Sequence, residues 1–81
     1  MNYSISKHAS DVIESRNIKL IWIKYVLDNP SLKIVKASNE VNFYSSILEN
    51  EARCLKVVLN PISMIVVTAY FDRNMRKKGC S

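Results

Sequence analysis

Two apolar runs, ARCLKVVLN at residues 52–60 and SMIVVTAYF at residues 63–71, decide how this chain folds. Both runs are rich in β-branched and aromatic residues, and both are short enough to be strands. The Asn60-Pro61 pair between them is a turn signal. We therefore predict a β-hairpin as the centre of the structure.

Alternation assigns the side chains of this hairpin to the two faces of a sheet. In the first strand Leu55, Val57 and Leu59 point to one face, whereas Lys56 points to the other. In the second strand the two predicted sets are Ile65, Val67, Ala69 and Phe71, and Met64, Val66, Thr68 and Tyr70. We expect helices to cover the apolar face, which leaves the mixed face with Lys56, Thr68 and Tyr70 available to a ligand.

The first part of the chain predicts an edge strand and two helices. Residues 2–5 alternate as in a short strand, and Ser6 is a cap for a helix from Lys7 to about Ser15. A second helix, from about Leu20 to Asp28, carries a broad apolar surface and should end before Pro30. These helices are expected to supply the layer that the sheet requires.

After Pro30 the period changes to two, which predicts strands at about 32–35 and 42–48 with a loop at 37–40 between them. Asn50-Glu51 is a plausible turn into the hairpin. The predicted fold class is α+β in the order β-α-α-β-β-β-β, an antiparallel sheet backed by two N-terminal helices. We predict one domain over residues 1–81, in which residues 72–81 form a basic C-terminal extension.

Composition narrows the functional classes. The 81 residues carry 12 basic and 7 acidic side chains, a net charge of +5, which favours an anionic partner. No signal peptide and no apolar run near the ~18 residues of a membrane span are visible, so we expect a cytoplasmic protein that does not bind membranes and has free thiols. Cys54 and Cys80 lack a metal-ligand spacing. We expect neither a metal nor a cofactor, and no glycine-rich phosphate loop or nucleophile elbow is present.

Several segments together resemble a bacterial family of small uncharacterised domains. The N-terminal half carries Ser6-Lys7-His8-Ala9 and then Leu27, Asn29 and Pro30, similar to that family's S-K-H-A and L-x-N-P motifs. Between them, Glu14 to Ile18 resembles E-R-G-I, with one extra residue and with Asn17 at the glycine. In the second half, RCLKV at 53–57 resembles R-x-L-R-V, and VTAYFDR at 67–73 resembles V-T-V-F-F-D-R.

This resemblance implies a fold similar to the RelE/BrnT-like toxins, several of which cleave RNA without a metal. Such chemistry requires a base, an acid, cations for the pentacoordinate phosphate and an aromatic ring for a base. The candidate catalytic residues are His8, Lys56 and Tyr70. The candidate RNA- or phosphate-binding residues are Arg53, Arg73, Arg76, Lys77 and Tyr44.

Each candidate also has an ordinary structural interpretation. His8 in a first helical turn is by default an exposed histidine, and Lys56 is compatible with the solvated side of a strand. Arg53 is able to pair with Glu49 or Glu51, and the basic tail is compatible with a solubilising extension.

Three functional hypotheses therefore stand side by side. The first is a toxin-like ribonuclease that acts alone or on the ribosome. The second is a non-catalytic RNA- or protein-binding module of the same fold. The third is an interaction protein covered by an acidic antitoxin-like partner through strand addition or a charged groove.

Overall fold

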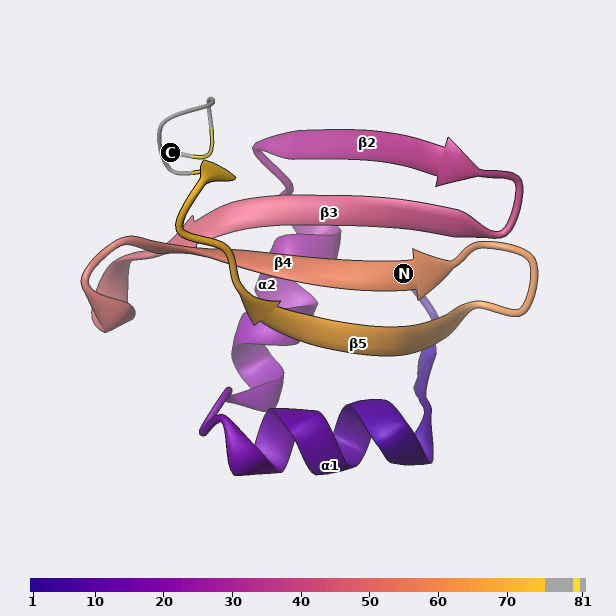
Figure 1. Cartoon of the computed structure of the whole chain (residues 1–81), viewed down its shortest axis with the longest axis horizontal. Helices are drawn as coiled ribbons and strands as arrows, with labels where there is room; N and C mark the ends of the chain where they lie inside the picture. The colour runs from indigo at the N-terminus through magenta and orange to yellow at the C-terminus, as the bar shows by residue number, and fades with distance from the viewer. Residues whose placement is uncertain (76–79, 81) are drawn as a thin grey trace.

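The chain folds as an α+β domain, which confirms the predicted class. The computed structural model describes residues 1–75 and 80. In chain order its elements are β1 (Ser4–Ile5), α1 (Lys7–Ser15), α2 (Leu20–Asp28), β2 (Leu32–Ala37), β3 (Glu40–Ile47), the 3-10 turn η1 (Leu48–Asn50), β4 (Arg53–Asn60) and β5 (Ile65–Phe71). Figure 1 shows α2 behind the sheet and α1 along the side of β5.

The five strands form one mixed sheet in the order β1-β5-β4-β3-β2. Strands β2 to β5 are antiparallel neighbours, and β4 and β5 form the predicted hairpin. Strand β1 pairs in parallel with β5, through Ser4 beside Ile65 and Ile5 beside Val66. The prediction of an antiparallel sheet is therefore wrong at this edge. No hairpin joins β1 to β5, so the intervening elements are free to return the chain in the same direction.

Both helices lie at the predicted bounds for identifiable reasons. The Ser6 hydroxyl accepts a hydrogen bond from the Ala9 amide at 3.0 Å and so caps α1. Helix α1 buries Ala9 and Ile13, whereas α2 buries Trp22, Ile23, Val26 and Leu27. Between the helices Asn17 adopts a left-handed conformation with φ 55°, which Asn tolerates better than most residues with a side chain. This turn directs α2 across the sheet.

The core lies between the helices and the face of β4 that carries Leu55, Val57 and Leu59. These three side chains are at most 2% exposed, so the predicted apolar face of this strand is confirmed. Full burial of each one stabilises the fold by roughly 1.5–3 kcal/mol relative to an exposed position.

A β-bulge in β5 overturns part of the predicted facing. Val58 pairs with Thr68, but Leu59 pairs with Val66, so Val67 is an extra residue in its strand. As a result Val66 is fully buried in the core and Val67 is 37% exposed, the reverse of the prediction. Strict alternation fails here because one inserted residue shifts every side chain that precedes it to the other face.

The turns use side chains instead of glycine. Asn60 Oδ1 accepts hydrogen bonds from the Ile62 and Ser63 amides at 2.9 and 3.2 Å, which closes the β4–β5 turn. Strands β2 and β3 extend to Ala37 and Glu40, which pair directly, so the predicted loop at 37–40 shrinks to a two-residue connection. The predicted strand end at Leu48 is instead the start of η1.

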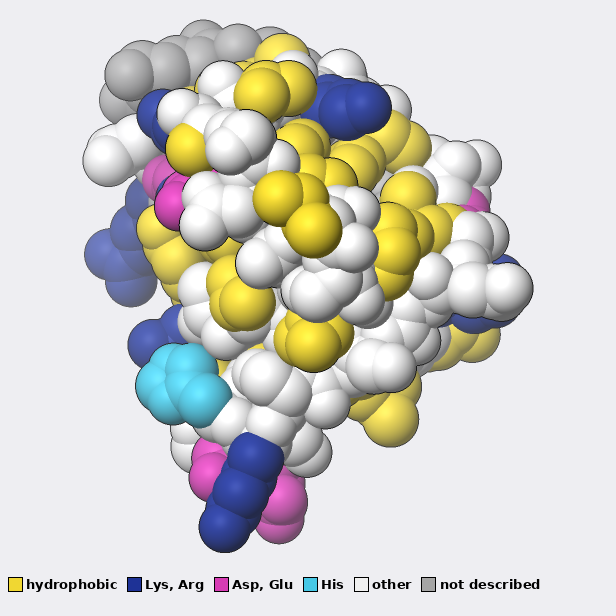
Figure 2. All heavy atoms as spheres, turned by 90° about the vertical axis from the view of Figure 1, so that its right-hand side faces the viewer, with side chains coloured by type: hydrophobic (Ala, Val, Ile, Leu, Met, Phe, Trp, Pro, Cys, Tyr) yellow, Lys and Arg dark blue, Asp and Glu magenta, His cyan; other side chains and the backbone are white. Residues whose placement is uncertain are grey.

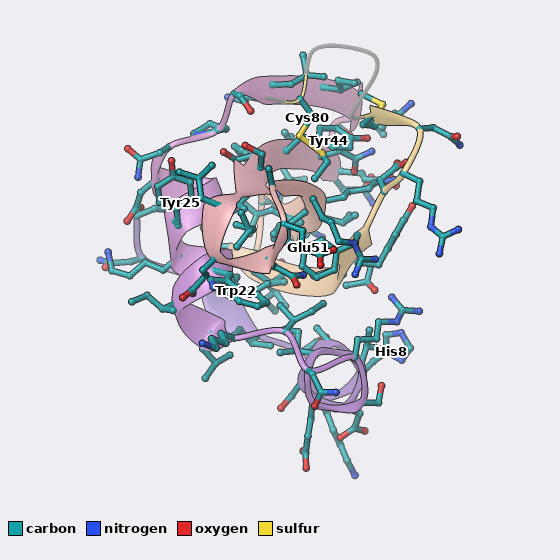
Figure 3. All side chains as sticks on the ribbon, turned by 90° about the vertical axis from the view of Figure 1, so that its left-hand side faces the viewer. His8, Trp22, Tyr25, Tyr44, Glu51 and Cys80 are labelled. Atoms are coloured by element: carbon teal, nitrogen blue, oxygen red, sulfur yellow. A yellow bond between two sulfur atoms is a disulfide. The ribbon has the colours of Figure 1, made fainter. Side chains whose placement is uncertain are left out.

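A disulfide joins Cys54 in β4 to Cys80, so the prediction of free thiols is wrong. The two residues are separated by 26 positions, and no spacing rule in the sequence signals their contact. Cys54, Cys80 and Tyr44 form a small buried cluster with Leu32, Ile34 and Met75 on the sheet face away from the helices, called here the outer face. Figure 3 shows Tyr44 beside Cys80 on this face.

Two further findings concern membrane-spanning helices and the basic C-terminal extension. In the part of the chain that the structure describes, no helix is long and apolar enough to span a membrane. Arg76 and Lys77, predicted to bind phosphate, lie outside the described residues.

Candidate functional site

A row of polar and aromatic side chains crosses the outer face. The strand register places Tyr44 beside Lys56, and Lys56 beside Tyr70. Lys56 Nζ donates a hydrogen bond to Tyr70 Oη at 2.9 Å and lies 5.0 Å from the centroid of that ring. Two of the three predicted catalytic residues are therefore in direct contact, as their shared face suggested.

The surroundings of Lys56 keep it a cation. Partial burial alone would lower the pKa of this ammonium, but the hydrogen bond to Tyr70 and the charges of Tyr44, Tyr70 and Asp72 raise the pKa above its ordinary value. Lys56 is then protonated at neutral pH. It is able to stabilise negative charge or to polarise the Tyr70 hydroxyl, but it is not a base.

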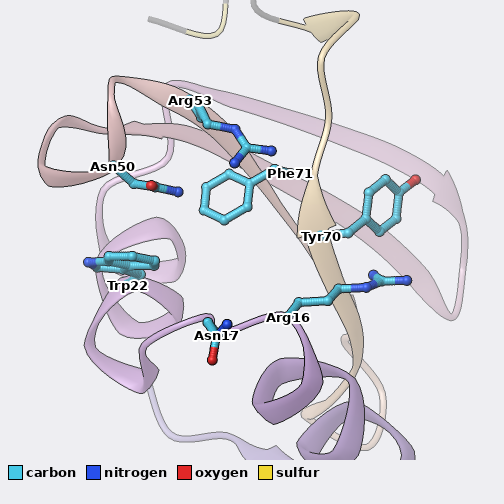
Figure 4. Close-up of a pocket in the computed structure, with 7 residues that line it drawn as sticks. All are labelled: Arg16, Asn17, Trp22, Asn50, Arg53, Tyr70 and Phe71. Atoms are coloured by element: carbon cyan, nitrogen blue, oxygen red, sulfur yellow. The ribbon is translucent and has the colours of Figure 1, made fainter.

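Tyr70 also borders a cleft of about 620 Å³. The turn after α1, the first turn of α2, the end of η1, the start of β4 and the end of β5 meet there. Figure 4 shows the residues that line it: Arg16, Asn17, Trp22, Asn50, Arg53, Tyr70 and Phe71. Tyr70 and Phe71 are neighbours in β5 and point to opposite faces of the sheet. The cleft therefore lies at the boundary between the helix-covered face and the outer face.

Two guanidinium groups reach this cleft from different elements. Arg16, at the end of α1, donates from Nη1 to the Ala69 carbonyl oxygen at 3.0 Å, and its Cζ lies 5.7 Å from the Tyr70 ring centroid. Arg53, at the start of β4, places its Cζ 4.6 Å from the Phe71 ring centroid. These contacts fix the positions of both side chains, and they do not neutralise the positive charges because the partners are aromatic rings and a carbonyl oxygen.

The ion pairs among residues 1–75 and 80 use other cations. They join the N-terminal ammonium and Lys24 to Asp28, and Lys19 to Glu49. Arg16 and Arg53 take part in none of these pairs. A cleft with two guanidinium groups that lie outside these ion pairs favours an anionic ligand such as a phosphate or carboxylate.

The aromatic side of the cleft is tied to η1. The Trp22 and Phe71 rings meet edge to face, with centroids 6.0 Å apart and an interplanar angle of 73°. Trp22 Nε1 donates to Glu49 Oε1, and Lys19 pairs with the same carboxylate at 3.8 Å. These contacts fix the turn that presents Asn50 to the cleft.

The model of a family described as a domain of unknown function, DUF4258, matches residues 5–71. The chain belongs to the DUF4258 family. No curated protein and no solved structure matches it. All the residues that line the cleft lie inside the part matched to DUF4258, whereas Cys80 lies beyond it.

His8 does not line the cleft of this DUF4258 domain. Its side chain is exposed on the first turn of α1, and Figure 2 shows the ring on the surface. Ser6 and Ala9 make the contacts that cap this turn, so His8 is directed away from the core by the helix period. His8 therefore does not share the cleft with Tyr70, and its catalytic role stays a prediction.

Tyr44 and Arg73 also lie away from the cleft. Tyr44 is only 3% exposed because Met75 and Cys80 pack over the outer face, so its ring is not accessible for stacking on a base as predicted. Arg73 is exposed in the turn after β5, where Asp72 accepts a hydrogen bond from the Asn74 amide. Among the predicted phosphate-binding residues that the structure describes, Arg53 is the one that lines the cleft.

Sequence reasoning missed five residues of the site, which are Arg16, Asn17, Trp22, Asn50 and Phe71. Arg16 and Asn17 interrupt the apolar pattern between the two helices, which is a weak signal for side chains at a helix end. Trp22 and Phe71 fit a core pattern, which gives no sign that they also line a cleft. Among the described residues no group of three or more His, Cys, Asp or Glu side chains is arranged to bind a metal ion.

Proposed function

We propose that this DUF4258 domain binds RNA in the cleft and cleaves it as a toxin-like endoribonuclease that requires no metal. The observation that carries the proposal is the Lys56–Tyr70 hydrogen bond beside the Arg16 guanidinium. The α+β fold is compatible with the relationship to RelE/BrnT-like toxins that the sequence motifs imply, and that relationship is part of the proposal.

Binding rests on the two arginines. A guanidinium group donates two parallel hydrogen bonds to a phosphate, and each such charge-assisted contact is stronger than a neutral one. Arg16 and Arg53 both line the cleft, so each is able to bind a phosphate of an RNA strand that lies in it. The net charge of +5 adds long-range attraction to an RNA backbone.

Cleavage would proceed by attack of the ribose 2′-oxygen on the adjacent phosphorus. The O2′–P bond forms, the P–O5′ bond breaks, and a 2′,3′-cyclic phosphate and a 5′-hydroxyl result. Lys56 donates its hydrogen bond to Tyr70, which leaves the phenolic proton free to move to the departing 5′-oxygen. The 2′-proton passes to water, and Arg16 stabilises the charge on the pentacoordinate phosphate.

A non-catalytic RNA-binding module is the second candidate, and the position of His8 favours it. The sole imidazole of the chain is outside the cleft, and the Lys56 ammonium stays protonated. The residues that line the cleft include no neutral amine or imidazole to act as base. In this case RNA binds at the same arginines and remains intact.

The proposal includes an acidic, antitoxin-like protein partner. Carboxylates satisfy the same guanidinium geometry as phosphates, so an acidic segment in the cleft competes with RNA. Purified protein with a bound RNA should release it when a glutamate-rich peptide is added, more than with a glutamine-rich peptide of equal length.

A cytoplasmic location also remains a proposal. Disulfides persist mainly in oxidising compartments, so the redox state of Cys54 and Cys80 in cells checks this location directly. Alkylation of intact cells followed by mass spectrometry measures the fraction of free thiol. Fully alkylated cysteines agree with the cytoplasm, whereas a fully protected pair contradicts it.

The test of the function is an RNA-cleavage assay in EDTA, with and without ribosomes. We expect products with 2′,3′-cyclic phosphate ends, and a loss of rate of about 10²–10⁴-fold in Tyr70→Phe if the hydroxyl is the acid. Lys56→Met should lose a comparable factor, whereas His8→Ala should cleave like the wild type.

Binding of RNA by all three variants without cleavage by any protein, including the wild type, would leave the binding module as the function. An inactive His8→Ala variant with an active Tyr70→Phe variant would contradict the assignment of the chemistry to the Lys56–Tyr70 pair.

A further inference from the structure

Half of the cleft has no part in binding phosphate. Trp22 and Phe71 line it with aromatic rings, and Asn17 and Asn50 line it with side chains that carry amides. From this half we infer that the cleft contains a nucleobase subsite, which receives one unstacked base of single-stranded RNA against Trp22 and Phe71. The inference rests on the proposed RNA binding and adds that the protein recognises a base as well as the backbone.

The aromatic geometry provides a corner. The Trp22 and Phe71 rings are nearly perpendicular, at 73°, so a flat ligand that stacks on one of them meets the edge of the other. The Arg53 Cζ lies 4.6 Å from the Phe71 ring centroid, which adds a planar guanidinium beside these rings. Single-stranded RNA is bound through such stacking on aromatic rings and on arginine planes.

The amides stand where they would meet the edge of that base. Asn17 is held outward by its left-handed turn after α1, and Asn50 ends η1, which Glu49 ties to Trp22. In Figure 4 Asn50 lies above Trp22 on the side of Phe71, and Asn17 lies between Trp22 and Arg16. An Asn amide offers a donor and an acceptor side by side, which suits the hydrogen-bonding edge of an unstacked base.

The size of the cleft agrees with one nucleotide. Its volume of about 620 Å³ lies in the ordinary range for small-molecule sites, roughly 300–1,000 Å³. Bases inside an A-form duplex are stacked and paired, so they do not reach a recessed corner. The subsite therefore selects single strands over duplexes.

Trp22 is the sole tryptophan of the chain, so its fluorescence reports on ligand binding in the cleft. Trp22 emission is followed while the protein is titrated with hexamers of adenylate, of uridylate and of abasic ribose phosphate, and with an RNA duplex. We expect the adenylate hexamer to change the emission saturably. The abasic hexamer should bind about tenfold more weakly, because stacking of one base is lost, and should leave the emission unchanged.

Asn50→Ala tests the amide without touching the core. This variant should bind the adenylate hexamer more weakly than the wild type does and keep the wild-type affinity for the abasic hexamer. Asn39→Ala, in the exposed β2–β3 connection, is the matched control and should behave like the wild type.

Equal binding of the adenylate, uridylate and abasic hexamers would overturn the subsite while leaving RNA binding at the arginines intact. Equal binding of duplex and single strands would overturn it as well. Failure of every RNA to bind would remove the proposed function and the subsite together.

Discussion

The two faces of this sheet are built on different principles. The face covered by α1 and α2 is a continuous apolar layer in which Leu55 and Val57 are fully buried. The outer face is closed in part by a disulfide, and it carries the Lys56–Tyr70 pair beside the small cluster around Tyr44. One face supplies stability through burial, and the other carries polar groups that burial would penalise.

This difference explains where the candidate site lies. A cleft inside the apolar layer would cost stability, and a site in the middle of the outer face would lack walls. At the end of β5 the adjacent residues Tyr70 and Phe71 give access to both faces at once. Arg16 lies over Tyr70 on the outer side of this boundary, whereas Arg53 lies over Phe71 on the helix-covered side, where Trp22 meets the same ring.

The largest effect is expected from a cavity in the helix-covered face. Leu55 is 0% exposed at the centre of the core, so Leu55→Ala should lower the free energy of unfolding by roughly 3–5 kcal/mol. Urea denaturation measures this loss. Ile62→Ala, at a residue that is 74% exposed in the β4–β5 turn, is the control and should change stability by less than about 0.5 kcal/mol. Similar losses in both variants would show that this face is not the source of stability.

Reduction of the disulfide on the outer face should have the next largest effect on stability. It closes a separation of 26 residues, for which the loop-entropy estimate is about 3.5 kcal/mol. Adding a reductant should lower the unfolding free energy of the wild type by roughly 2–4 kcal/mol. A Cys54→Ser/Cys80→Ser variant should start at the lower stability and not respond to reductant. A wild type whose urea midpoint ignores the reductant would contradict this contribution.

Substitution of Asn42 should have a smaller effect on the free energy of unfolding, and of the opposite sign. This side chain is 1% exposed, and within residues 1–75 and 80 neither its amide nitrogen nor its oxygen has a hydrogen-bond partner. Asn42→Leu keeps the volume and removes the desolvated amide, so it should raise the free energy of unfolding by about 1 kcal/mol. Asn39→Leu, at an exposed position, should give no such gain. A destabilised Asn42→Leu variant would mean that this amide has a role that the contacts do not reveal.

The smallest effect concerns the pH dependence of the Lys56–Tyr70 pair. The pKa of Lys56 is raised in the folded state, so its contribution is fully present below the unfolded pKa of about 10.4 and is lost as pH rises through the higher folded pKa. The stability advantage of wild type over Lys56→Met should therefore stay constant up to about pH 10 and shrink at higher pH. An advantage that stays constant or grows at this higher pH would contradict the raised pKa.

The sequence predicts the features that depend on local pattern. The hairpin, both helices and the contact of Lys56 with Tyr70 follow from periodicity, capping and alternation, each of which acts over a few residues. The facing of Val66 and Val67 does not follow from alternation, because the β-bulge at Val67 leaves no signal in the residue types.

The site was harder to predict because it depends on the tertiary fold. Arg16 and Arg53 are far apart in the chain, and they meet only when α1 is docked beside β5. Tyr44 was placed on the correct face, but the packing of Cys80 over it depends on a contact 36 residues away in sequence. His8 was chosen for its residue type alone, and residue type does not fix position.

The most direct measurement is the affinity for a labelled single-stranded RNA, followed by fluorescence anisotropy in EDTA, of two charge-matched double variants. Arg16→Gln/Arg53→Gln removes both cations of the cleft, and Lys33→Gln/Lys36→Gln removes two from β2 at the opposite edge of the sheet. We expect the first variant to bind about 100-fold more weakly and the second to lose less than about threefold. Equal losses in the two variants would mean that RNA is attracted by net charge alone, and would contradict a binding site at the cleft.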